Sequence, residues 1–205
     1  MYPTIKTYCD QLVAQFDEIP AERKALLEKV SAFILKKKSA GLDIKLVYIC
    51  THNSRRSHFG QVWANVAADY FEVENVSTFS GGTEATAFNP NAINALRRVG
   101  FDISTIEEGK NPVYRVAHSD SYVPSICFSK VYDDVANPQS GYAAIMTCSD
   151  AEENCPFIPG VELRIGTTYD DPKAFDNTPQ QDAKYDERCR QIALETFYVF
   201  SKISQ

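Results

Sequence analysis

The sequence predicts an α/β fold, with a doubly wound, mainly parallel four-stranded sheet, helices on both faces and an N-terminal helical extension. Short β-rich apolar runs alternate with longer segments of helical periodicity, which favours parallel strands joined by crossover helices. The chain has 205 residues, of which 44% are hydrophobic and 23% charged. This length and composition are typical of one globular domain with a buried core and an appendage.

The N-terminal extension is predicted over residues 1–41. One helix is expected over 3–16 and a second after Pro20, where apolar residues recur at helical spacing. The second helix ends in a lysine-rich turn that suits the helix dipole, and Gly41 follows as its exit. Its apolar stripe must be buried, either on the sheet domain or in a homodimer formed through these helices.

The sheet domain is predicted over residues 42–205. Its strands are expected at 44–49, 76–80, 142–147 and 161–165. Its helices are expected at 57–71, 89–100 and 182–202. Residues 112–140 interrupt the alternation with a segment rich in Tyr, Val, Ser and Asp, so we expect an insertion that forms a hairpin or a long lid.

Charge and hydropathy exclude several classes of partner. The 21 basic and 27 acidic residues give a net charge of −6, which disfavours nucleic acid because phosphate backbones bind basic surfaces. No apolar run approaches the roughly 20 residues that cross a membrane, and the N-terminus lacks the pattern of a signal peptide. We therefore expect no membrane partner and a cytoplasmic protein, in which the six cysteines are thiols.

The central motif is the run Cys50-Thr51-His52-Asn53-Ser54-Arg55-Arg56-Ser57, between a predicted buried strand and a predicted helix. Main-chain N–H groups and the helix dipole favour an oxyanion at such a place. Arg56 can bind two anion oxygens, and the same field favours the nucleophilic thiolate form of Cys50. Ser57 can donate a hydrogen bond to the sulfur. The predicted anion-binding residues are Thr51, His52, Asn53, Ser54, Arg55, Arg56 and Ser57.

Arg55 and Asp171 are the other charged candidates near this loop. Arg55 either adds positive potential or points to solvent, and solvent is the expectation. A nucleophile of this kind needs an acid for the departing oxygen. Asp171 is the candidate acid because it follows the last predicted strand, at the edge of the sheet where α/β sites form. Pro172 stiffens the loop that carries it.

These motifs resemble a known superfamily. The stretch 47–71 and the runs SGGTEATAFNPNAINALRRVGFDIS, MTCSDAEENCP and YDDP are similar to the low-molecular-weight protein tyrosine phosphatases and, within that superfamily, to the thioredoxin-coupled arsenate reductases. The resemblance covers residues 44–108 and 141–203 in outline. It implies that Cys50 forms a thiol–arsenate adduct while Arg56 holds the anion and Asp171 protonates the departing oxygen.

The pair Cys148 and Cys155 is what favours a reductase within this superfamily. The resemblance implies that Cys148 attacks Cys50, that arsenite leaves, and that Cys155 then moves the disulfide to Cys148–Cys155. Thioredoxin is the implied reductant, arsenate or phosphate the implied oxyanion, and no organic cofactor is needed. The other cysteines match no motif and are expected to be buried apolar side chains: Cys9, Cys127 and Cys189.

No metal site is expected. Cys148 and Cys155 lack further ligands, because the only histidines are His52, His58 and His118. Asn53 and Ser80 match the pattern of a potassium site near the loop in some relatives, but Gln61 stands where those relatives have a carboxylate.

Two alternatives to arsenate reduction remain open. The first is a phosphatase acting on phosphotyrosine or a small phosphoester through Cys50, Arg56 and Asp171, with Cys148 and Cys155 protecting the nucleophile from oxidation. The second is a regulatory protein that binds an anion or a partner without catalysis. Cys50→Ser would leave the function of such a regulatory protein intact.

Overall fold

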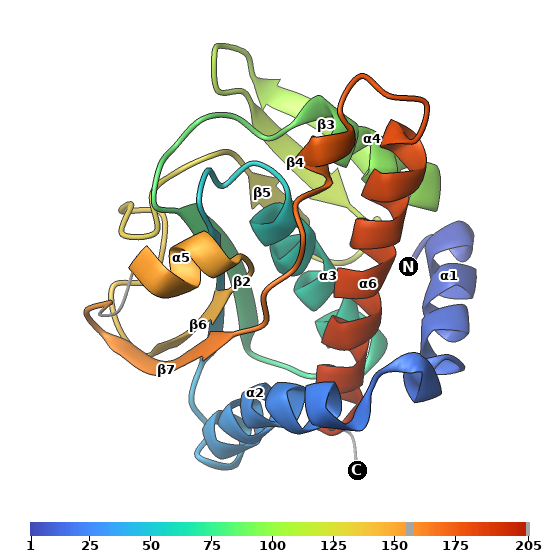
Figure 1. The fold of residues 1–205 in the computed structure, drawn as a ribbon. Coiled ribbons are helices and arrows are strands. Elements are labelled where there is room, and N and C mark those ends of the chain that lie inside the picture. Colours follow the sequence, from blue (N-terminus) through green and yellow to red (C-terminus); the bar gives the residue numbers. More distant parts are fainter. Residues whose placement is uncertain (155–157, 204–205) are drawn as a thin grey trace.

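A four-stranded parallel sheet lies at the centre of the computed structural model, which describes residues 1–154 and 158–203 (Figure 1). Its strands are β1 (Ile44–Cys50), β2 (Val76–Gly82), β6 (Tyr142–Met146) and β7 (Val161–Gly166). Their order is β2-β1-β6-β7, with every neighbouring pair parallel. All four predicted strands are therefore confirmed, and the carboxyl ends of β1, β2 and β6 lie at the same edge.

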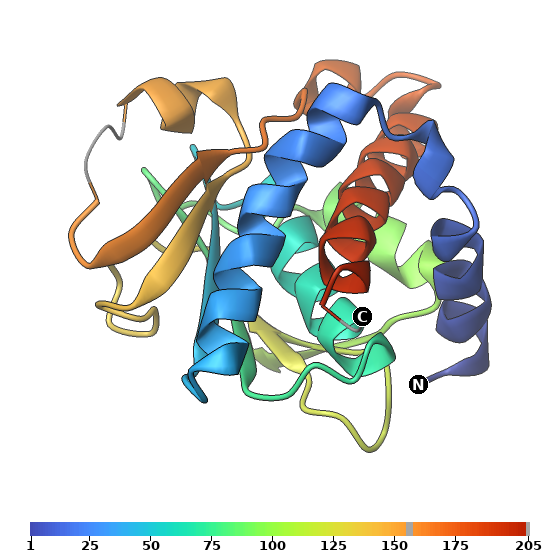
Figure 2. The same ribbon diagram turned by 90° about the horizontal axis from the view of Figure 1, so that it is seen from below.

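Helices lie on both faces of this sheet, as predicted, but more of them pack on one face than on the other. They are α1 (Pro3–Val13), α2 (Ala21–Ser39), α3 (Arg56–Tyr70), α4 (Pro90–Val99), α5 (Ser149–Asn154) and α6 (Gln181–Ser201). Figure 2 shows the short α5 (orange) on one side of the sheet, with α2 (blue) and α6 (red) on the other. The sequence pattern did not predict α5, because this helix is too short to show a helical repeat.

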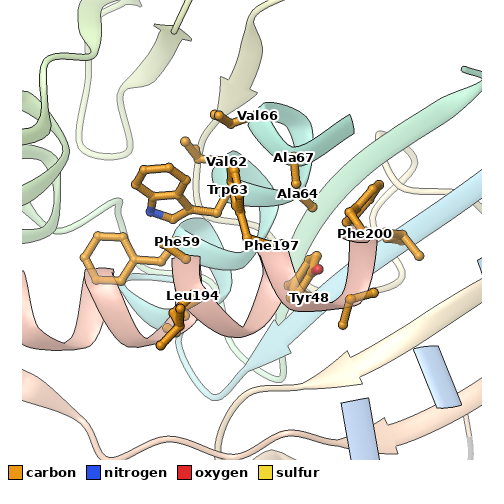
Figure 3. Packing of buried hydrophobic residues seen from close by; sticks show 14 of the residues in the cluster. Tyr48, Phe59, Val62, Trp63, Ala64, Val66, Ala67, Leu194, Phe197 and Phe200 are labelled. Atoms are coloured by element: carbon orange, nitrogen blue, oxygen red, sulfur yellow. The ribbon is translucent and has the colours of Figure 1, made fainter. Parts of the chain in front are cut away.

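The larger core lies between the sheet and helices α2, α3 and α6. Trp63 of α3 is fully buried and makes an edge-on contact with Phe197 of α6 (Figure 3). It makes a second edge-on contact with Phe101. Tyr48 of β1 contributes to the same core. The opposite face of the sheet packs a smaller cluster that includes both Cys50 and Cys148. The alternation along β1 thus directs Tyr48 and Ile49 to opposite faces.

The N-terminal helices bury their apolar residues against the same chain. Leu27, Val30 and Ile34 of α2 belong to the larger core, and both α1 and α2 contact α6. The Tyr2 main-chain N–H also donates to the His118 carbonyl at 2.8 Å. The apolar stripe is therefore buried on the sheet domain, which is one of the two predicted alternatives. The other, a homodimer formed through these helices, stays a prediction.

The insertion forms a second sheet rather than a lid. β3 (Asp102–Glu107), β4 (Val113–Ala117) and β5 (Ser125–Cys127) pair antiparallel in that order. The hairpin expectation is thus confirmed for β4 and β5, and β3 joins them from before the predicted insertion. The following segment, residues 129–137, closes the outer edge of β2, since Gly82 N–H donates to the Lys130 carbonyl and Tyr132 N–H to the Gly82 carbonyl, both at 2.9 Å.

A helix that crosses a membrane must be long and apolar. Within residues 1–154 and 158–203, none of the helices has the length and apolar character for it.

Candidate active site

Cys50 ends β1 at the carboxyl edge of the sheet and is 3% exposed. The chain then turns through residues 51–55, and α3 begins at Arg56. Gly82 of β2 pairs with Cys50 in the sheet. A Cβ atom added to Gly82 would lie 2.7 Å from the Asn53 nitrogen and from the Thr51 carbonyl oxygen. Only glycine allows the loop to pack this closely against β2.

A chain of hydrogen bonds leads from the insertion to the nucleophile. The Lys130 main-chain N–H donates to Asn53 Oδ1 at 2.9 Å, and Asn53 Nδ2 donates to Ser57 Oγ at 2.9 Å. Ser57 Oγ lies 3.1 Å from Cys50 Sγ. Asn53 holds a left-handed conformation with φ of 42°, which asparagine tolerates better than most residues. Ser57 therefore lies beside the sulfur, as predicted from the sequence.

The main-chain N–H groups of the loop are the second feature of this site. In the part of the chain that the structure describes, those of residues 52–55 donate to no protein acceptor. The carbonyl side of the loop is fixed instead: the hydroxyls of Thr86 and Ser129 both donate to the His52 carbonyl, at 3.1 and 3.0 Å. Ser54 Oγ likewise donates to the Ala87 carbonyl at 2.8 Å. This arrangement holds the loop while leaving its amide donors for an anion.

Arg56 joins the loop to the candidate acid. Its side chain is 9% exposed, and its Nη2 donates to Asp171 Oδ2 at 2.7 Å while Nη1 donates to the Tyr169 carbonyl at 2.8 Å. Its Nε is buried and has no partner among the described residues. Asp171 also accepts from the Lys173 main-chain N–H at 3.0 Å, which fixes its carboxylate over the first turn of the 3₁₀ helix Pro172–Phe175. Arginine and acid, distant in sequence, thus meet in the fold.

Arg55 does not point to solvent, so that expectation is wrong. The residue is 8% exposed, and its Nε donates to the Tyr185 hydroxyl at 2.8 Å. Its guanidinium lies 3.5 Å from an Asp176 oxygen and 3.9 Å from one of Asp171. The partners come from the C-terminal quarter of the chain, which is why the local sequence could not show them.

Cys148 lies beside the loop, two residues after β6. Thr147 N–H donates to the Ile49 carbonyl at 2.7 Å, which sets this segment against the end of β1. Cys148 Sγ is 3.4 Å from Thr51 Oγ1 and accepts from Ala151 N–H at 3.4 Å. The structure therefore brings Cys148 next to the loop of Cys50. Cys155, its predicted relay partner, lies outside the described residues.

The remaining cysteines are buried away from this loop, as expected. Cys9, Cys127 and Cys189 are each 0–1% exposed. Desolvation raises the pKa of each of these thiols to about 12. They therefore remain protonated at neutral pH and act as small apolar side chains.

The potassium candidates make protein hydrogen bonds instead. Ser80 Oγ donates to Gln61 Oε1 at 2.7 Å and lies 3.2 Å from His58 Nδ1. Asn53 Oδ1 is engaged by Lys130 N–H. Because Gln61 brings no carboxylate and these oxygens already have partners, the residues present do not fit a potassium site.

Several residues that shape the site were missed in the sequence. They are Ser129 and Lys130 of the insertion, Tyr169, Asp176 and Tyr185. The tyrosine two residues before Asp171 was the one available signal. Ser129, Lys130 and Asp176 lie in segments without a motif, and Tyr185 lies near the start of the last helix.

Individual relatives, rather than a family model, show which family the chain belongs to. No family model matches the chain. It is 33% identical over 133 residues to arsenate reductase 2 of Staphylococcus epidermidis, which covers 64% of this chain and 81% of that protein. It is 28% identical over 151 residues to the arsenate reductase of Bacillus subtilis, with 73% and 89% covered.

Solved structures show the same fold. An arsenate reductase in the phosphate binding state superposes with a TM-score of 0.53 at 17% identity, covering 78% of this chain and 98% of that one. A low-molecular-weight phosphotyrosine phosphatase from Vibrio cholerae gives 0.52 at 12%, with 77% and 95% covered. The chain therefore shares the fold of a low-molecular-weight phosphotyrosine phosphatase, and by its sequence identity it belongs to the arsenate reductase family.

Proposed function

We propose that the chain reduces arsenate to arsenite, with Cys50 as the nucleophile and Cys148 and Cys155 as a disulfide relay. The position of Cys148 carries the proposal, because its buried Sγ lies 3.4 Å from the hydroxyl of Thr51, the residue after Cys50. A hydrolase needs no second thiol at this place, since water completes its reaction. A reductase needs one, because two electrons leave the protein as a disulfide forms.

The first proposed step forms a sulfur–arsenic bond. Arsenate binds to the main-chain N–H groups of residues 52–55 and to the guanidinium of Arg56. The Cys50 thiolate attacks arsenic, one As–O bond breaks, and Asp171 donates the proton with which that oxygen leaves as water. Arg56, which donates to Asp171 at 2.7 Å, exchanges part of this contact for the oxyanion.

The next steps transfer two electrons to arsenic. The Cys148 thiolate attacks Cys50 Sγ, the S–As bond breaks with its electron pair on arsenic, and arsenite leaves as a Cys50–Cys148 disulfide forms. The Cys155 thiolate then attacks Cys148 Sγ and releases the Cys50 thiolate. A dithiol reductant of the thioredoxin class reduces the Cys148–Cys155 disulfide and supplies the two electrons.

The relay requires α5, which follows Cys148, to rearrange. α5 is held to β7 by Arg164, whose Nη1 donates to Glu152 Oε1 at 2.8 Å and whose Nη2 donates to the Glu152 carbonyl. Both side chains are partly exposed, at 23% for Arg164 and 34% for Glu152. Such a pair contributes about 1 kcal/mol or less, so it is weak enough to open during turnover.

The experiment that tests the relay is arsenite production with thioredoxin, thioredoxin reductase and NADPH. Wild type is expected to turn over many times, whereas Cys155→Ser stops after about one equivalent because its disulfide cannot reach the reductant. Cys9→Ala is the matched control, since it removes a buried thiol outside the relay. Equal multiple turnover by Cys155→Ser and wild type would rule out the relay.

The same loop and acid also suit phosphoester hydrolysis. Asp171 is 30% exposed and lies against Arg56, so it can protonate the leaving oxygen of a phosphoester as well as that of arsenate. Hydrolysis of an aryl phosphate at ordinary enzyme rates, without arsenite formation, would favour the phosphatase. In that case Cys148 and Cys155 would protect Cys50 from oxidation.

A further inference from the structure

A cavity of about 540 Å³ lies at the outer edge of β2, and no residue of the 50–57 loop lines it. Its walls are residues 76–79 of β2, residues 122–126 before and within β5, and the α3 side chains Gln61 and Asn65. Phe128 and Lys130 complete the lining. The volume falls within the ~300–1,000 Å³ of small-molecule sites.

Hydrogen bonds from α3 hold the outer wall in place. Gln61 Nε2 donates to the Ile126 carbonyl at 3.1 Å, and Asn65 Nδ2 donates to the Val123 carbonyl at 2.9 Å. Both donors stand one turn apart on a buried helix. The cavity is therefore built by fixed contacts and needs no closure to form.

Most of the lining is apolar. The side chains that give it this character are Val76, Phe79, Val123, Ile126 and Phe128. Val123 is 76% exposed and Ile126 43%, although both are large and hydrophobic. Covering such side chains with an apolar ligand stabilises a complex by about 25 cal/mol per Å² of apolar surface buried.

Lys130 is the only charged residue in this lining. It is 4% exposed, and its ammonium lies 4.3 Å from the centroid of the Phe128 ring. Within the described part of the chain no carboxylate comes within 4 Å of it; Asp134 acts only from farther away and accepts from Ala136 N–H at 2.8 Å. Burial lowers the pKa of Lys130. A buried ammonium is costly without a counter-ion, so the cavity favours an anion at this point.

We propose that this cavity binds a small carboxylate with an apolar tail, whose carboxylate pairs with the Lys130 ammonium and whose tail covers the apolar wall. The site is separate from the oxyanion loop and independent of the proposed reduction of arsenate. A neutral molecule of the same shape gains the apolar contact but leaves Lys130 unpaired, so charge as well as shape determines affinity.

The test compares octanoate with 1-octanol by titration calorimetry, with NMR amide shifts to locate the site. Inorganic phosphate is present throughout, so that the oxyanion loop cannot account for octanoate binding. Octanoate should bind wild type more tightly than 1-octanol, and Lys130→Met should weaken octanoate by roughly tenfold or more while leaving 1-octanol little changed. The matched control is Lys110→Met, which removes an exposed lysine outside the cavity.

A second variant keeps the test decisive if Lys130→Met does not fold. Val123→Asp puts a negative charge at an exposed position of the wall, and it should weaken octanoate but not phosphate. Equal binding of octanoate and 1-octanol by wild type, or unchanged octanoate binding by Lys130→Met, would overturn the proposal. Absence of saturable octanoate binding, or amide shifts confined to residues 50–57, would overturn it as well.

Discussion

Arg23 of α2 and the buried Glu195 of α6 form an ion pair, with Arg23 Nη2 2.7 Å from Glu195 Oε2. The same carboxylate oxygen accepts from the Tyr169 hydroxyl at 2.7 Å, and Arg23 donates to the Thr167 carbonyl at 3.0 Å. Because the Tyr169 carbonyl accepts from Arg56, the N-terminal extension supports the segment that carries the candidate acid.

Removing Arg23 should therefore destabilise the protein. Arg23→Met leaves the Glu195 carboxylate, 6% exposed, without its counter-ion, and we expect the free energy of unfolding to fall by about 3 kcal/mol. Urea denaturation measures this change. Lys29→Met, at an exposed position of the same helix, is the control and should change stability by about 0.5 kcal/mol or less. Equal stability of the two variants would contradict a structural role for the pair.

Asn53 is predicted to be a positioning residue for the oxyanion loop. Asn53→Ala loses the bonds to Ser57 and Lys130 and places alanine at φ of 42°, which costs about 1–2 kcal/mol. Asn53→Gly loses the same bonds without the backbone cost. We expect Gly to recover stability but not activity, so that both variants produce arsenite roughly tenfold more slowly or worse. Full activity in Asn53→Gly would show that only backbone conformation matters.

The fold could be predicted further than the site. Every strand of the main sheet could be predicted from its apolar run and the turn residues that bound it. This works because parallel strands buried on both faces are continuous apolar runs. The helix over Ser149–Asn154 and strand β3 carried no such signal, since one is short and the other largely exposed. Within the site, Cys50 and Arg56 are close in sequence and could be predicted together. The partners of Arg55 are residues 176 and 185, which only tertiary packing brings next to it.

His58 should make stability depend on pH. Desolvation, reinforced by the positive charge of Lys130, lowers the pKa of His58 to about 3. The unfolded chain binds a proton at its ordinary pKa of about 6.5, so between these values the unfolded state holds more protons and stability falls as pH falls. The contribution is fully present above pH ~6.5 and declines by up to about 1.4 kcal/mol per pH unit below it.

His58→Asn isolates this effect, because it removes the titration and retains a polar atom toward Ser80. We expect the variant to be less stable than wild type at neutral pH, and the difference to shrink as the pH is lowered from 7 toward 4.5. Chemical denaturation at each pH measures both curves. A difference that stays constant with pH would show that the buried histidine does not titrate on unfolding.

Thiol reactivity should divide the cysteines into two groups. Cys9, Cys127 and Cys189 are buried and have pKa values raised to about 12, so the thiolate that iodoacetamide attacks is scarce at neutral pH. We expect them to react at least about a thousandfold more slowly in the native protein than in denaturant. Cys50 should react in the native state and be protected by phosphate bound at its loop. Peptide mass spectrometry assigns each site, with Cys50→Ser as the control, and rapid native labelling of Cys189 would contradict its burial against Trp63, whose Nε1 donates to Cys189 Sγ at 3.2 Å.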